Sequence, residues 1–70
     1  MKAEKIRDLS TEEIQIQLDE AREELMNLRF QQATGELMDF TQMRFIRRSI
    51  ARYLTILRER EMIDAREGGA

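Results

Sequence analysis

The stretch that decides the fold is residues 43–60, MRFIRRSIARYLTILRER, which has the pattern of one amphipathic helix. At about 100° per residue, its main apolar side chains fall on one side, within about 100° of arc. That apolar side consists of Met43, Ile46, Ile50, Tyr53, Leu54 and Leu57. We therefore predict a helix that buries this side against a second element and turns its other side outward.

The outward side of this helix is basic, and Ala51 and Thr55 lie between its charges. It carries Arg44, Arg47, Arg48, Arg52 and Arg58, called here the arginine face. No acid lies between Asp39 and Glu59, so these arginines have no partner at helical spacing within their own stretch. A guanidinium binds phosphate through two parallel hydrogen bonds. The pattern favours nucleic acid over a solvated face or a face for an acidic protein, and Thr55 could add a hydroxyl contact.

The preceding stretch predicts a helix over about residues 11–33. Ser10 and Glu13 have the spacing of a capping box, in which the serine side chain accepts a hydrogen bond from the backbone three residues on. Gly35 can adopt the positive φ that often ends a helix. The apolar positions in between recur in steps of four and three, typical of a heptad seam: Ile14, Leu18, Ala21, Leu25 and Leu28.

Two helices of similar length joined by a short turn pack antiparallel. We predict an all-α fold: an antiparallel two-helix hairpin that forms a single domain over residues 1–70. Its parts are a short leading helix at about 2–8, a helix at about 11–33, a turn at 34–39, a helix at about 40–62 and a frayed tail at 63–70. The expected register places Leu28 beside Ile46, Leu25 beside Ile50, Ala21 beside Leu54 and Leu18 beside Leu57.

Composition excludes several classes of function. The chain has 70 residues with no Cys and no His, which removes disulfides, the usual transition-metal ligands and the common nucleophile–base pairs. We therefore expect that the protein is not an enzyme and that it binds no metal, no cofactor and no small-molecule substrate. The apolar runs are too short for a membrane helix, so we expect a cytosolic protein without membrane contact.

The net charge of −2 hides an asymmetry between the two parts of the chain. Residues 1–40 carry five basic and ten acidic side chains, whereas residues 41–70 carry seven basic and four acidic ones. Local charge rather than the total decides what a surface attracts. The arginine face can therefore attract an anion although the chain as a whole is acidic.

A second candidate contact region lies at the end of the first long helix. Arg29, Gln32 and Thr34 offer polar donors near the expected turn, where they could continue the basic surface or simply form an exposed helix end. Three apolar residues do not fit the seam, and we expect a neighbouring protein or RNA to contact Phe30 and Ile16. The residues off the seam are Ile16, Met26 and Phe30.

Three stretches together resemble the bacterial large-subunit ribosomal protein twenty-nine family. They are residues 6–13 (IRDLSTEE), residues 24–37 (ELMNLRFQQATGEL) and residues 46–60 (IRRSIARYLTILRER), the last with the pattern Arg-x-x-Ile-Ala-Arg-x-x-Thr. The resemblance spans nearly the whole chain. One departure from many relatives is that this chain is acidic overall and has only two lysines, Lys2 and Lys5.

The resemblance implies a structural, ribosome-associated protein of the cytoplasm that binds large-subunit ribosomal RNA near the peptide exit tunnel. It also implies a neighbour there, ribosomal protein twenty-three of the large subunit. Arg47, Arg48, Arg52 and Thr55 match the RNA-facing helix of the family. Arg29, Gln32 and Thr34 match the segment at the hairpin end.

The residues also allow a different class of function. The heptad seams suit a protein-only coiled-coil hairpin that dimerises into a four-helix bundle or docks on an acidic partner. Such a module does not need a face with five arginines and no acidic residue. The presence of the arginine face therefore favours the RNA hypothesis.

Overall fold

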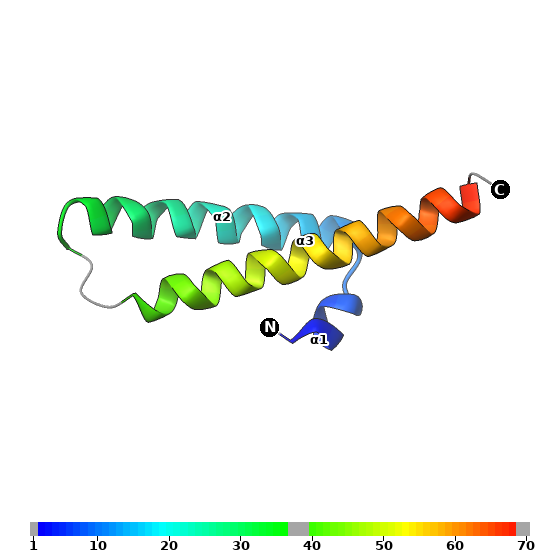
Figure 1. The fold of residues 1–70 in the computed structure, drawn as a ribbon, viewed down its shortest axis with the longest axis horizontal. Coiled ribbons are helices and arrows are strands. Elements are labelled where there is room, and N and C mark those ends of the chain that lie inside the picture. Colours follow the sequence, from blue (N-terminus) through cyan, green and yellow to red (C-terminus); the bar gives the residue numbers. More distant parts are fainter. Residues whose placement is uncertain (1, 37–39, 69–70) are drawn as a thin grey trace.

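The computed structural model describes residues 2–36 and 40–68, which form an all-helical hairpin. A short helix α1 (Ala3–Arg7) precedes the two long helices α2 (Thr11–Ala33) and α3 (Thr41–Gly68). The long helices run antiparallel side by side, and α1 lies against α3 (Figure 1). The molecule is elongated, with principal extents of 53 × 20 × 15 Å. The predicted fold class is confirmed.

Both ends of α2 have the predicted local chemistry. The Ser10 hydroxyl oxygen accepts a hydrogen bond from the backbone N–H of Glu13 at 3.1 Å, which caps the helix. At the other end Gly35 has a φ of +81°, a conformation that glycine adopts without steric cost. Residues 37–39 of the expected turn lie outside the described residues.

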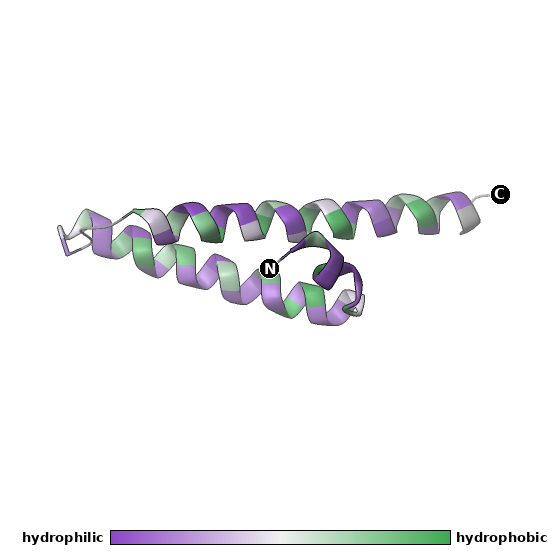
Figure 2. Ribbon diagram, turned by 90° about the horizontal axis from the view of Figure 1, so that it is seen from below, coloured by the Kyte–Doolittle hydropathy of each residue, from purple (hydrophilic) through white to green (hydrophobic). Residues whose placement is uncertain are grey.

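The core consists of two apolar clusters arranged along the hairpin. The N-terminal cluster joins all three helices through Ile6, Ile14, Leu18, Tyr53 and Ile56. The turn-side cluster joins α2 and α3 through Leu25, Leu28, Met43 and Ile46. Ala21 and Ile50 pack against both clusters and connect them. The alternation of apolar and polar residues along both long helices is visible in Figure 2, as amphipathic helices require.

The buried side of α3 is rotated about the helix axis relative to the predicted apolar side. Leu54, predicted to lie in the core beside Ala21, is 43% exposed, so that prediction is wrong. Ile56, absent from the predicted set, is buried at 3% exposure. The reason is α1: Ile6 packs in the same cluster as Ile56, so α1 covers one flank of α3. The other expected pairs do share clusters, including Leu18 with the half-buried Leu57.

The helix α3 continues to Gly68, beyond the predicted end near residue 62. Residues 59–67 contain no Gly or Pro, and several of them are strong helix formers, so nothing local stops the helix before Gly68. The expected frayed tail at 63–70 is therefore helical as far as residue 68, and residues 69–70 lie outside the described part. As a result the C-terminal turns of α3 project past α2 (Figure 1). They expose Met62 and Ile63.

Arg60 joins the three helices through hydrogen bonds. Its guanidinium donates to the Thr11 hydroxyl at 3.1 Å, to the Arg7 carbonyl at 3.1 Å and to the Leu9 carbonyl at 2.8 Å. Carbonyls at a helix end lack partners within the helix, so Arg60 satisfies groups that the turn between α1 and α2 leaves open. None of the described helices combines the length and apolar character that crossing a membrane requires.

Candidate nucleic-acid interface

All five residues of the arginine face are exposed on α3. Ala51 and Thr55 between them are exposed as well, so an extended anion could approach the helix backbone closely. Within the described residues, four of the five arginines take part in no salt bridge: Arg44, Arg47, Arg48 and Arg58. Their charge is therefore not neutralised by a direct acidic partner in that part of the chain.

The structure brings Arg48 and Arg52 together with α1. These two arginines line a hollow with Lys2 and Lys5, which lie more than 40 positions earlier in the sequence. Phe45 and Ser49 complete the lining, and we call this set of six residues the α1–α3 hollow. Neither lysine could be assigned to the site from the sequence, because only the docking of α1 on α3 places them there.

Thr55 lies beside this region and lines a smaller adjoining hollow with Arg52, Arg7 and Ala51. Its hydroxyl donates to the Ala51 carbonyl at 2.8 Å, the backbone four residues earlier. That bond uses the only proton of the hydroxyl. Thr55 can therefore accept a hydrogen bond from a ligand as it stands, but must release Ala51 before it can donate to a phosphate.

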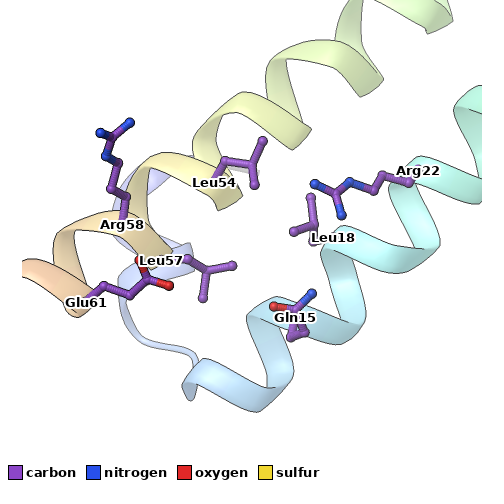
Figure 3. A pocket seen from close by; sticks show the side chains of 7 residues that line it. All are labelled: Gln15, Leu18, Arg22, Leu54, Leu57, Arg58 and Glu61. Atoms are coloured by element: carbon purple, nitrogen blue, oxygen red, sulfur yellow. The ribbon is translucent and has the colours of Figure 1, made fainter.

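Arg58 lies on the opposite flank of α3, in the groove between the two long helices. It lines this groove with Arg22 and Gln15 of α2 and Glu61 of α3, above an apolar floor (Figure 3). The floor consists of Leu18, Leu54 and Leu57. The arginine face is therefore divided between two flanks, with Arg48 and Arg52 towards α1 and Arg58 towards α2.

The second candidate region lies at the end of the molecule where α2 meets the turn (Figure 1). Arg29, Gln32 and Thr34 are all exposed, and Thr34 donates its hydroxyl proton to the Gln31 carbonyl at 3.0 Å. Arg44 lies in the first turn of α3, so it is the member of the arginine face nearest to this end (Figure 1). Arg58, by contrast, lies towards the N-terminal end of α2.

The apolar residues off the α2 seam are exposed as the pattern predicted. Phe30 is 71% exposed, and Ile16 and Met26 are also open to solvent. Phe45 of α3 is a further exposed aromatic, which the helical pattern of the sequence did not single out. In the described residues there is no group of three or more His, Cys, Asp and Glu side chains that could hold a metal ion.

These features define a small helical-hairpin protein with a basic outer face on its longest helix. The family model for the ribosomal L29 protein matches residues 4–60. The chain belongs to this family of ribosomal proteins, which is not known as an enzyme family.

Curated relatives match this chain over most of their own length. The large ribosomal subunit protein uL29 of Staphylococcus haemolyticus is 50% identical over 66 residues, which cover 94% of this chain and 96% of the relative. The uL29 proteins of Staphylococcus aureus strain JH9 and Staphylococcus carnosus are each 53% identical over 62 residues, covering 89% of this chain and 90% of each relative. The family resemblance inferred from the three sequence stretches is thereby confirmed.

Proposed function

We propose that this chain is a structural constituent of the large ribosomal subunit that binds ribosomal RNA through the arginine face of α3. The family supports the ribosomal role, and the curated relatives are named as large-subunit proteins. The chain would act in the cytoplasm as part of the ribosome and would carry out no chemistry. Its task would be to hold RNA segments in place.

One observation carries the RNA assignment: the arginine face is exposed, and four of its members have no salt-bridge partner in the described part of the chain. Exposed, uncompensated guanidinium groups match a phosphate backbone in charge and in geometry. Acidic side chains of α2 such as Glu12, Glu20 and Glu23 are themselves exposed to solvent. The anionic partner of Arg44, Arg47, Arg48 and Arg58 would therefore come from outside the described part of the chain.

The finer parts of the proposal come from the family resemblance. Arg29, Gln32 and Thr34 would add contacts at the turn end of the hairpin, where all three are exposed. The binding place would be near the peptide exit tunnel, beside ribosomal protein twenty-three of the large subunit. The exposed Phe30 and Ile16 would face a neighbouring protein or RNA there.

A salt titration tests the RNA assignment. The isolated chain is titrated with fragments of large-subunit ribosomal RNA, and each phosphate neutralised should add about −0.7 to −0.9 to the slope of log affinity against log salt. The double variant Arg48→Glu, Arg52→Glu should bind at least tenfold more weakly, since two attractive charges become repulsive. Arg22→Glu, on α2 and outside the arginine face, is the matched control and should keep most of the affinity. Equal affinity of all three proteins, or no dependence on salt, would contradict the proposal.

The groove between α2 and α3 favours a second candidate function. Its floor includes the 43% exposed Leu54, so the hairpin leaves part of its seam uncovered (Figure 3). A protein-only module would cover this floor by dimerising or by docking on a partner protein. Sedimentation equilibrium decides the dimer case: a mass that stays monomeric over a hundredfold range of concentration excludes a four-helix assembly.

A further inference from the structure

An exposed aromatic ring lies among four cations in the α1–α3 hollow. Phe45 is 61% exposed, although a phenyl ring gains free energy when it is removed from water. It lies three positions before Arg48 and seven before Arg52, so the three side chains share one flank of α3. Lys5 of α1 and Lys2, which directly precedes α1, line the same hollow.

This combination matches the chemistry of an unpaired nucleotide. A nucleobase has a flat apolar face that stacks on an aromatic ring, and its backbone carries phosphates that attract Lys and Arg. No acidic side chain lines the hollow in the described part of the chain, so an anion meets no local repulsion there. Ser49, which is half-buried at the edge, offers a neutral hydroxyl for a base edge or a ribose.

We propose that the α1–α3 hollow binds one unpaired nucleotide of RNA, with its base stacked on Phe45 and its flanking phosphates held by Arg48, Arg52, Lys2 and Lys5. The inference rests on the proposed RNA-binding function and adds to it a local site and the kind of nucleotide it takes. A base inside a duplex is excluded, because both of its faces are already stacked on neighbouring bases. An anion without bases would use the cations alone and leave the ring uncovered.

The chain contains no tryptophan, which makes a direct test possible. The variant Phe45→Trp places a single indole fluorophore at the proposed stacking position. Ile63→Trp places the same fluorophore on the projecting end of α3, where Ile63 is also exposed, and serves as the matched control. Each full-length variant is titrated with deproteinised large-subunit ribosomal RNA and, separately, with inorganic polyphosphate, while anisotropy of a dye label on the chain reports binding.

Stacking predicts that the RNA quenches the indole fluorescence of Phe45→Trp more strongly than that of Ile63→Trp, and that polyphosphate binds without this quenching. It also predicts that Phe45→Ala lowers RNA affinity by about tenfold, the usual loss for one stacked base. The variant Phe45→Tyr should restore the affinity. Because Phe45 is exposed, its replacement should leave the helix content unchanged, as circular dichroism can verify.

Two different failures can be told apart. If the anisotropy shows RNA bound but the indole of Phe45→Trp is unquenched, or is quenched equally by polyphosphate, the stacking site is wrong and the RNA-binding function stands. If the anisotropy shows no RNA bound by the wild-type chain at low salt, the proposed function fails and the stacking site fails with it.

Discussion

At the scale of single residues, Arg60 differs from the other arginines of its helix. It is half-buried, and its guanidinium makes three hydrogen bonds to the segment between α1 and α2. The five residues of the arginine face are exposed instead. One residue type therefore occupies two environments on α3: Arg60 joins the three helices, whereas the arginine face lies exposed on the outer side.

We expect Arg60→Ala to lower the free energy of unfolding by about 1–2 kcal/mol, because three hydrogen bonds are lost and one of their acceptors, the Leu9 carbonyl, is part-buried. Arg60→Lys should recover only part of this loss, since an ammonium lacks the planar fork that reaches several acceptors at once. Urea denaturation followed by circular dichroism measures both. Arg58→Ala is the control and should change stability by less than about 0.5 kcal/mol, as exposed sites usually do. Equal losses for Arg58 and Arg60 would contradict the role assigned to Arg60.

The apolar pattern of α3 shows which core residues a sequence can reveal. Met43, Ile46 and Tyr53 belong to the predicted apolar side, and all three are buried as predicted. Leu54 lies at one edge of that side and Ile56 lies beyond the other edge, where neighbouring elements decide which residue is buried. The helix α1 covers the edge at Ile56, and nothing in the described chain covers Leu54 to the same extent. The periodicity of one helix therefore cannot predict that Ile56 is buried and Leu54 is exposed.

At the scale of elements, α1 has an influence larger than its five residues suggest. Ile6 is fully buried in the N-terminal cluster, and the same helix brings Lys2 and Lys5 to the α1–α3 hollow. The sequence predicted a short leading helix, but not the surface on which it packs. The exposure of the arginine face could be predicted from α3 alone, whereas the contribution of the lysines depends on contacts between residues far apart in the chain.

We expect Ile6→Ala to release α1 and to cost at least about 2 kcal/mol, the lower range for an isoleucine truncated in a core. Hydrogen exchange should then show faster exchange for the amides of residues 3–9 than for those of α2. The control Ile63→Ala, at an exposed position on the projecting end of α3, should leave exchange unchanged. If α1 keeps its protection in Ile6→Ala, its docking depends on Arg60 and the turn more than on the apolar contact.

At the scale of the whole molecule, the hairpin is thin. Its radius of gyration is 15.0 Å, whereas a compact domain of this length would have about 11 Å. An elongated fold exposes more surface per residue than a compact one and buries few residues deeply. Small chains of this kind usually need a partner for full stability. The salt bridge between Arg7 and Glu59, at 3.7 Å, is exposed and adds little.

Binding to RNA should therefore stabilise the chain measurably. With RNA at a hundred times its dissociation constant, the free energy of unfolding rises by about 2.7 kcal/mol. We expect the slowest-exchanging amides of α2 and α3 to exchange about a hundredfold more slowly under these conditions. The double variant Arg48→Glu, Arg52→Glu should lose most of this protection, measured against its own exchange rates without RNA. Unchanged exchange at saturating RNA would mean that the binding does not depend on the folded hairpin.

The division of the core into two clusters also has a consequence for the order in which the chain folds. The turn-side cluster joins residues between 25 and 46, whereas the N-terminal cluster must bring residues 6 and 56 together. Closing the shorter loop loses less chain entropy, so pairing should begin next to the turn and proceed towards the other end. The helix α1 should then dock last, after α2 and α3 have formed the surface on which it packs. The hollow that contains Lys2 and Lys5 is accordingly the final part of the surface to be completed.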